Sequence, residues 1–467
     1  MTMEMKQMFA KEIYASRRAK LGQALKGIAL FPANPPSPMN YAHNTLPYAQ
    51  DGCFAYFFGI PQPDLVGALD LDSGESFLFG DDPTLDALIW LGTSTPMREW
   101  ADRCGADKVL PYSALADWLG ERRRGRDVHF TPPYRGELTI ALAQWLDLPV
   151  QAVAGRASLT LVRAIIAQRE IKAPEEIAEM EAALAVTAEM HAAAMRLARP
   201  AIMEHLVSGA VEGVARSADL HLAYPVILSA SGEVLHNDRH DRRLEAGDLI
   251  VHDSGASSRL GYASDITRTL PVGGRFQARQ RVCYDLVLKS QLAAIDACRP
   301  GTPYLDVHKL AARVLVEGMI AEGVFRGAAD EIVESGAYAL VFQTGVGHQI
   351  GLDVHDMEAL GENYVGYDAS VQRSELFGLR NLRMAKPLKP GMVVTVEPGL
   401  YFIPALIDHW ESESRYSGTI DYARVREFIP VHGIRIEDDV LITGAGHRVL
   451  GPGIPKTATE METALAN

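Results

Sequence analysis

The pattern of hydrophobic and polar positions changes along the chain near residue 158. Before that point, short apolar runs bounded by Gly, Pro, Asn or Asp predict strands. They lie at residues 27–33, 54–60, 65–71 and 76–80. A helical pattern at residues 115–122 follows them. Strands interleaved with helices are typical of a small α/β domain, which we place at residues 1–157.

A long helix opens the second domain, which we place at residues 158–467. Pro174 occupies a natural first helical position, and Glu175 and Glu176 complement the positive end of the helix dipole. Arg199-Pro200 ends this helix. Further strands are predicted at residues 249–253, 269–272, 393–397 and 433–441, helices at 280–298 and 304–322, and a polar inserted excursion at 358–390.

Charge and cysteine content narrow the class of protein. Of 467 residues, 45 are Lys or Arg and 59 are Asp or Glu, so the net charge is 45 − 59 = −14. The chain has no basic stripe, which argues against binding nucleic acid. It also lacks a signal-peptide stretch and a run of 18 apolar residues, so we expect a cytoplasmic protein without a membrane-spanning helix. Four scattered cysteines without CxxC spacing fit reduced thiols.

Acids and histidines gather at the ends of the predicted strands of the second domain. They are Asp253, Asp265, His348, His355, Glu397 and Glu437. A carboxylate that ends an apolar strand is poorly solvated, and binding a cation is one way to avoid the cost of burying it unpaired. Carboxylates that converge with an imidazole suit Mn²⁺, Co²⁺ or Zn²⁺. The four carboxylates bring −4 and two divalent cations would bring +4, which favours a two-metal site.

Each of these residues also has a purely structural explanation. An Asp at a strand end is commonly a turn former or a helix cap. His348 can be a core histidine bonded to a carbonyl, and Glu397 before Pro-Gly can be an ordinary turn residue. Arg435 can pair with its strand neighbour Glu437. The residues alone therefore leave a metal site and these structural roles both open.

Five motifs together resemble the pita-bread metallopeptidases, and specifically the branch that holds prolidase (Xaa-Pro dipeptidase) and aminopeptidase P. The motifs are Asp-x-Gly from Asp253, Ser-Asp-Ile-Thr-Arg-Thr, Gly-His followed by Leu-Asp-Val-His-Asp, Thr-Val-Glu-Pro-Gly, and Arg-Ile-Glu-Asp-Asp. The match covers about residues 160–455. The resemblance implies an α+β fold, with a C-terminal pita-bread catalytic domain and a smaller N-terminal α/β domain.

The resemblance also assigns roles to particular residues. The metal ligands it implies are Asp253, Asp265, His348, Glu397 and Glu437. Among them, Asp265 and Glu437 would bridge two divalent metal ions, for which we expect Mn²⁺, while Co²⁺ or Zn²⁺ fits the same ligands.

Further residues match positions that act on the substrate. The resemblance implies that His236 and His355 contact the substrate and steady the developing oxyanion, and that Arg435 lies close to the metals. Arg383 resembles the prolidase arginine that binds the free carboxylate of a dipeptide, a pairing that a guanidinium makes bidentately. The alternative for Arg383 is a surface arginine in the excursion.

The predicted function is hydrolysis of the Xaa-Pro bond by a hydroxide that bridges the metals, with Glu397 handling the proton. A dipeptidase of the prolidase type is favoured. The alternatives are an aminopeptidase P that acts on longer peptides and, more remotely, a non-catalytic pita-bread binding module. The expected partners are peptides with proline at the second position and, as a family expectation, a second copy of the chain, but neither nucleic acid nor a membrane.

Overall fold

The computed structural model describes residues 8–92 and 94–466, and the chain divides into two compact units. The first unit holds the chain up to Arg169 together with Met357–Tyr364, and the second holds Glu170–Asp356 and the chain from Val365 onward. This division follows helix α7 (Leu159–Arg169), whereas the domain boundary that we predict between residues 157 and 158 precedes it. That boundary stays a prediction. No helix within the described residues combines the length and the apolar character needed to cross a membrane.

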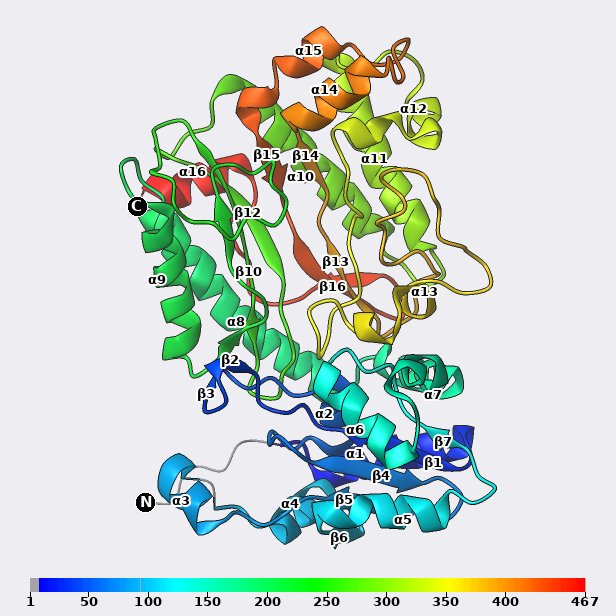
Figure 1. The fold of residues 1–467 in the computed structure, drawn as a ribbon. Helices are drawn as coiled ribbons and strands as arrows, with labels where there is room; N and C mark the ends of the chain where they lie inside the picture. The colour runs from blue at the N-terminus through cyan, green and yellow to red at the C-terminus, as the bar shows by residue number, and fades with distance from the viewer. Residues whose placement is uncertain (1–7, 93, 467) are drawn as a thin grey trace. The chain divides into compact units, whose positions relative to one another are not determined.

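A five-stranded sheet forms the centre of the first unit, in the order β6-β5-β4-β1-β7 (Figure 1). The three central strands pair antiparallel, and the two edge strands pair parallel to their neighbours. The strands of the sheet are β1 (Ile28–Pro32), β4 (Val66–Asp70), β5 (Ser76–Phe79), β6 (Lys108–Leu110) and β7 (Val128–His129), while β2 (Pro38–Tyr41) and β3 (Asn44–Thr45) pair with each other. The helices before α7 are α1 (Lys11–Ala24), α2 (Gly52–Phe58), α3 (Leu85–Leu91), α4 (Met97–Cys104), α5 (Leu115–Arg122) and α6 (Gly136–Leu146).

In the apolar run at residues 54–60, which we predict as a strand, residues 54–58 belong to helix α2. Asp51 caps this helix, because its Oδ1 accepts hydrogen bonds from the backbone N–H groups of Cys53 and Phe54, each at 2.9 Å. Gly59 ends the helix with a φ of 67°, in the left-handed region that favours glycine. The prediction was wrong because the cap and the glycine outweigh the strand preference of the aromatic residues.

Short antiparallel sheets and long helices build the second unit. One sheet has the order β12-β10-β9, another β13-β16-β17, and β14 pairs with β15. Helix α8 packs against α9 and α10 against α11 (Figure 1). The strands are β8 (His221–Leu222), β9 (Ile227–Ser229), β10 (Leu249–Ser254), β11 (Ala256–Ser257), β12 (Ile266–Pro271), β13 (Val393–Val396), β14 (Gly399–Tyr401), β15 (Gly433–Arg435), β16 (Asp438–Ile442) and β17 (His447–Val449). The helices are α8 (Pro174–Leu197), α9 (Glu204–Ser217), α10 (Ala278–Ala297), α11 (Tyr304–Ala321), α12 (Ala329–Ser335), α14 (Pro404–Ser412), α15 (Tyr422–Arg426) and α16 (Ala458–Ala466). Along the chain, the assignment changes from the first unit to the second within α13 (Glu362–Val365), after Tyr364.

Helix α8 begins and ends where the sequence predicts. Pro174 is its first residue, and the Oε2 of Glu176 accepts a hydrogen bond from the N–H of Ala173 at 2.9 Å. The helix ends at Leu197, just before Arg199-Pro200. The predicted α+β class is confirmed by these helices and the antiparallel sheets between them.

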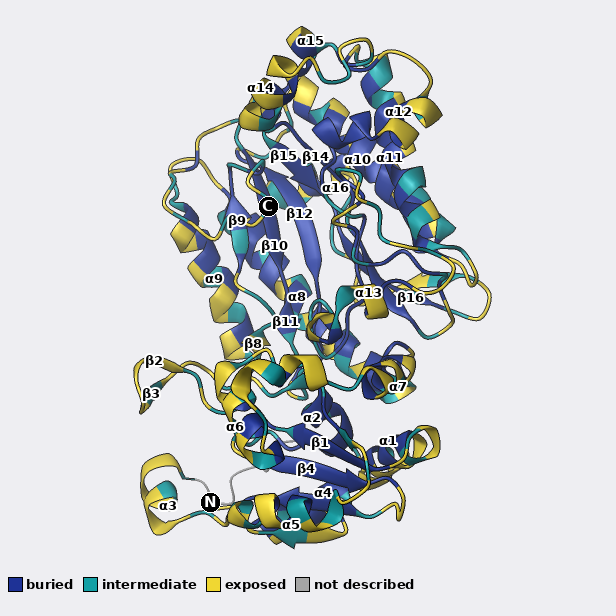
Figure 2. Ribbon diagram, turned by 45° about the vertical axis from the view of Figure 1, so that its right-hand side comes forward, coloured by how far each residue is buried: buried dark blue, intermediate teal, exposed yellow. Residues whose placement is uncertain are grey.

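The strand register brings the acid-bearing ends of the sheets together. In the antiparallel pair β10–β12, Ser254 lies opposite Ile266, so Asp253 and Asp265 sit at the same end of neighbouring strands. The backbone N–H of Glu437 donates to the carbonyl of Thr267 at 3.1 Å, which links this sheet to the segment between β15 and β16. Strands β10 and β12 are buried along their whole length (Figure 2). The acids therefore meet inside the second unit.

Candidate metal centre

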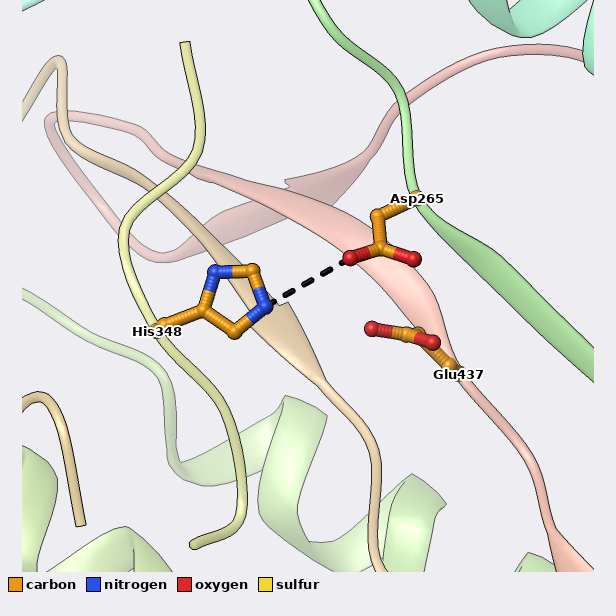
Figure 3. Close-up of side chains that lie close together, drawn as sticks. All are labelled: Asp265, His348 and Glu437. Carbon is orange, nitrogen blue, oxygen red and sulfur yellow. Dashed lines mark ion pairs between the residues drawn. The ribbon is translucent and has the colours of Figure 1, made fainter. Parts of the chain in front are cut away.

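Asp265, His348 and Glu437 form a buried cluster with the composition of a metal site. One potential ligand atom of each lies within 4.8 Å of those of the other two. Figure 3 shows the three side chains pointing toward one another from three segments of the chain. Asp265 directly precedes β12, Glu437 lies between β15 and β16, and the Nε2 of His348 is 3.4 Å from the Oδ2 of Asp265.

Backbone contacts orient the imidazole of His348. Its Nδ1 lies 3.0 Å from the carbonyl oxygen of Gln349, and because a carbonyl only accepts, Nδ1 carries the hydrogen. Nε2 therefore faces the acids, in the orientation that a metal-binding histidine needs. Burial opposes protonation, but the carboxylates of Asp265 and Glu397 outweigh it and raise the pKa of His348.

Glu397 lies beside His348 because β13 runs next to the segment that carries the histidine. The N–H of Thr395 donates to the carbonyl of His348 at 2.9 Å, and the N–H of Glu397 donates to the carbonyl of Val346 at 2.8 Å. The Oε1 of Glu397 is then 3.5 Å from the Nε2 of His348. A side chain at Gly347 would block this approach, since its Cβ would lie 2.1 Å from the carbonyl oxygen of Thr395.

Arg435 holds Asp253 at the edge of the cluster. Its Nη2 donates to the Oδ2 of Asp253 at 2.5 Å, its Nε to the hydroxyl of Thr267 at 3.0 Å, and its Nη1 to the hydroxyl of Tyr401 at 2.9 Å. The guanidinium is buried, and it forms an ion pair with Asp253 rather than with the strand neighbour Glu437. Thr267 also donates its hydroxyl hydrogen to Glu437 at 2.7 Å.

Tyr224 joins Asp253 to Asp265, and our reasoning from the sequence missed it. Its hydroxyl lies 2.5 Å from one carboxylate oxygen of each acid. The hydroxyl has one hydrogen and can satisfy only one of the two acids at a time. Tyr224 lies outside the motifs, so no pattern marks it, whereas Thr267 lies within Ser-Asp-Ile-Thr-Arg-Thr and could have been found.

The electrostatics of the cluster favour a cation. Burial raises the pKa of Asp253 to about 6 in spite of Arg435, and burial together with neighbouring carboxylates raises the pKa of Glu397 and of Glu437. Acids packed in this way must either hold protons or share a positive ion. A donor set of carboxylate oxygens and one imidazole fits a divalent ion of the Mn²⁺, Co²⁺ or Zn²⁺ type. The residues present therefore fit a metal.

His236, His355 and Arg383 interact electrostatically with one another and with residues of the cluster. The ring centroids of His355 and His348 are 4.4 Å apart. Burial lowers the pKa of His355 to about 2, with the positive charges of His348 and Arg383 acting in the same direction. Burial and the charges of Arg435 and Arg383 also lower the pKa of His236. Both imidazoles are therefore neutral near pH 7, and each can donate an N–H to an oxygen.

Comparison with known proteins identifies the family of the chain. A family model described as "Metallopeptidase family M24" matches residues 178–444. The chain belongs to metallopeptidase family M24. A second family model, "Aminopeptidase P, N-terminal domain", matches residues 14–130 of this M24 protein.

Relatives of this M24 protein span nearly its whole length. It is 31% identical over 480 residues to the Xaa-Pro aminopeptidase of Escherichia coli (strain K12), which covers 99% of both chains. It is 29% identical over 430 residues to the Xaa-Pro dipeptidase of Homo sapiens, covering 90% of this chain and 84% of that protein. Among solved structures, the aminopeptidase PepP of Pseudomonas aeruginosa superposes with a TM-score of 0.81, at 30% identity and 98% coverage of each chain. E. coli aminopeptidase P with the inhibitor Pro-Leu superposes equally well, with a TM-score of 0.81 at 28% identity, covering 98% of this chain and 99% of that chain.

These comparisons confirm the predicted resemblance and the predicted fold. The second unit of this M24 enzyme carries the pita-bread catalytic domain, and the smaller N-terminal domain is of the aminopeptidase P type. The protein is a metallopeptidase, and the cluster of Asp265, His348 and Glu437 supports its use of divalent metal.

Proposed function

We propose that this M24 metallopeptidase hydrolyses the bond before proline in Xaa-Pro dipeptides. The observation that carries the dipeptide preference is that the charge of Arg383 acts on both His236 and His355, where it adds to the effect of burial in lowering the pKa of each imidazole. A guanidinium in electrostatic contact with two imidazoles that are proposed to bind the substrate is well suited to a bidentate bond with the free carboxylate of a dipeptide. The Xaa-Pro dipeptidase of Homo sapiens among the relatives supports the choice of bond.

The proposed metal site holds two divalent ions, with Mn²⁺ expected before Co²⁺ or Zn²⁺. Its ligands are Asp253, Asp265, His348, Glu397 and Glu437. Asp265 lies between Asp253, to which Tyr224 links it, and His348, and one ligand atom each of Asp265, His348 and Glu437 lies within 4.8 Å of the others, so these residues would hold the ions at the centre of the site. Divalent ions held by these residues would supply polarisation of the scissile carbonyl and a lower pKa of water, towards 7.

The residues around the metals divide the remaining work. Glu397 accepts the proton of the attacking water and passes it to the nitrogen of proline, which leaves as a secondary amine. His236 and His355 donate N–H groups to the carbonyl oxygen as its negative charge grows, and such donors are worth about 3 kcal/mol each. Arg435 keeps Asp253 ionised and in place through its hydrogen bond at 2.5 Å.

Substrate length tests the dipeptide preference. With Mn²⁺ added, the enzyme should cleave Leu-Pro and reject Leu-Pro-Gly, and Arg383→Ala should lose cleavage of Leu-Pro. Arg380→Ala is a matched control from the same stretch, because Arg380 is exposed and its guanidinium lies 5.0 Å from the ring centroid of Phe377. Equal cleavage of both peptides, or an active Arg383→Ala enzyme, would reject the preference.

A second candidate is an aminopeptidase that removes the first residue of longer Xaa-Pro peptides. It is favoured by the superposition on E. coli aminopeptidase P, with a TM-score of 0.81 over 98% of this chain. In that case Leu-Pro-Gly should be the better substrate, and Arg383→Ala should leave its cleavage unchanged.

The proton transfer is tested separately from the substrate preference. Glu397→Gln, measured with its metal content checked, should lose nearly all turnover of Leu-Pro because the amide cannot accept the proton. Near wild-type turnover in a metal-loaded Glu397→Gln enzyme would refute the role of Glu397.

We also propose a homodimer in the cytoplasm. The support for self-association is helix α3, which is largely exposed (Figure 2). Among its apolar residues, Leu91 is 77% exposed and Trp90 is 81% exposed. An apolar helix exposed in this way is typical of an interface. Sedimentation of the wild type and of Trp90→Ala should show a dimer and a weakened dimer, and a monomeric wild type would reject the proposal.

A further inference from the structure

The segment that carries His236 has no regular secondary structure. Residues 231–242 form turns and irregular backbone between β9 and β10. At its start, the N–H of Ala230 donates to the Oε1 of Glu204 at 2.8 Å, and the Nδ2 of Asn237 donates to the hydroxyl of Ser229 at 2.9 Å. These bonds hold one side of the segment against β9 and α9. The approach of His236 to the acids therefore also depends on the contacts on the opposite side of the segment.

Two glycines let this segment lie directly against β15. A Cβ at Gly433 would lie 2.1 Å from the carbonyl oxygen of Gly232 and 2.9 Å from the nitrogen of Glu233. A Cβ at Gly232 would in turn lie 2.9 Å from the carbonyl oxygen of Gly433. No real Cβ contact is this short with backbone atoms, so the two segments touch through bare backbone. The contact lies two residues before Arg435 on one side and four before His236 on the other.

A hydrogen-bonded pair of side chains lies beside the glycine contact. The Nδ1 of His432 is 2.9 Å from the Oε2 of Glu233. Burial opposes ionisation of Glu233, but the hydrogen bond with His432 outweighs it and lowers the pKa of the carboxyl. The pair joins the His236 segment to the residue that directly precedes β15.

The backbone of His432 is strained. Its φ of 63° and ψ of −97° lie in a region that residues other than glycine rarely adopt. Such strain persists where surrounding contacts over-determine it, and it clusters at functional sites. The N–H of Phe402 donates to the carbonyl of His432 at 2.9 Å, so this strained residue is bound on its backbone as well as through its ring.

We propose that Glu233 and His432 form a clasp that holds the His236 segment against β15, which makes Glu233 a positioning residue for His236. The proposal rests on the proposed function, because the role of His236 belongs to it. The clasp acts at the point where the segment meets the strand that carries Arg435, so its loss lets His236 move away from the acids while the metal ligands keep their places.

A set of variants tests the clasp through its effect on His236. Glu233→Ala should lower kcat/KM for Leu-Pro about 10-fold, in line with the cost of small misplacements at a reacting centre. His432→Gly should do the same without unfolding the protein, because glycine adopts this φ without strain. Glu233→Gln keeps an acceptor oxygen and should recover part of the loss. Glu413→Ala is the control: it removes another Glu–His pair, with His409 on α14 at 3.6 Å, and should leave activity unchanged.

The decisive comparison is made in the His236→Ala background. If Glu233 acts through His236, adding Glu233→Ala to His236→Ala should not lower kcat/KM further. If Glu233 and His432 act as one pair, the double variant Glu233→Ala/His432→Gly should have a kcat/KM no lower than that of either single variant. An equal loss in both backgrounds would mean a general structural role and would overturn the proposal, as would full activity of Glu233→Ala.

A readout without activity separates this proposal from the proposed function. Amide hydrogen exchange of residues 231–242 should be faster in Glu233→Ala than in the wild type and in Glu413→Ala, at equal metal content. Unchanged exchange overturns the clasp. A wild type that cleaves neither Leu-Pro nor Leu-Pro-Gly, with exchange still faster in Glu233→Ala, overturns the proposed function and leaves the clasp in place.

Discussion

Gly366 lies against the backbone of Arg383, and replacing it tests how closely that arginine must be placed. A Cβ at Gly366 would lie 1.7 Å from the carbonyl oxygen of Arg383. The carbonyl of Gly366 also accepts the N–H groups of Ala385 at 2.8 Å and Lys386 at 3.0 Å, so the two segments are held together on both sides of the contact. The shortest separation that real Cβ atoms show is 3.0 Å, so Gly366→Ala requires a shift of at least 3.0 − 1.7 = 1.3 Å.

A shift of this size should appear in the recognition of the carboxylate. A misplacement of about 1 Å can cost about 100-fold in rate, so kcat/KM for Leu-Pro should fall by about that factor. Leu-Pro amide lacks the free carboxylate and should be cleaved by the variant and the wild type at similar rates. Gly418→Ala is the matched control, because a Cβ at Gly418 meets nothing within 4 Å.

Stopped assays with both substrates, at equal metal content, give the comparison. If Gly366→Ala keeps wild-type activity on Leu-Pro, the contact does not place Arg383. If it loses Leu-Pro and Leu-Pro amide equally while melting like the wild type, Arg383 is not the carboxylate-binding group. Overpacking typically lowers the free energy of unfolding by about 1–3 kcal/mol, so the melting temperature of each variant is measured alongside its activity.

Three further predictions concern the metal centre. Arg435→Lys keeps the charge but cannot bond to Asp253, Thr267 and Tyr401 together, so the affinity for metal should fall about 10- to 100-fold. The metal content after dialysis measures this loss, and a content equal to that of the wild type would contradict the prediction. Tyr224→Phe removes the hydroxyl between two carboxylates and should lower the metal content after dialysis, and an unchanged metal content would exclude a role of Tyr224 in holding the carboxylates. In chelator-treated protein the raised pKa of Asp253, about 6, gives stability that is present below its usual value near 3.8 and is lost as the pH rises through 6. The gain in melting temperature on adding metal should therefore be larger at pH 7.5 than at pH 5, and equal gains would refute the reasoning.

Local patterns in the sequence predict a large part of this molecule correctly. Helix α8 begins at Pro174 because proline and two glutamates favour a helix start in any context. The strand runs that end in Asp253 and Glu397 are recognisable because strand-forming residues alternate or cluster over a few positions. The run that forms α2 shows the limit of such patterns, since one capping aspartate and one glycine changed a predicted strand into a helix.

The contacts that complete the site depend on residues far apart in the chain. The hydrogen bond of Arg435 joins it to Asp253, 182 residues earlier, and no local pattern distinguishes this partner from the nearby Glu437. Gly366 and Gly433 look like ordinary loop glycines until the fold brings another backbone against each of them.

The sequence by itself determined the chemistry of this protein: the residue types, their order and their motifs identify a pita-bread metallopeptidase with acids and imidazoles for divalent metal. The tertiary structure decided how those groups are held. Tyr224 between two carboxylates, Arg435 on Asp253, and the pair of Glu233 and His432 arise from segments that meet only after folding. The physical reason is that side-chain type and helix or strand preference are local properties, whereas burial and charge pairing depend on which distant segments pack together.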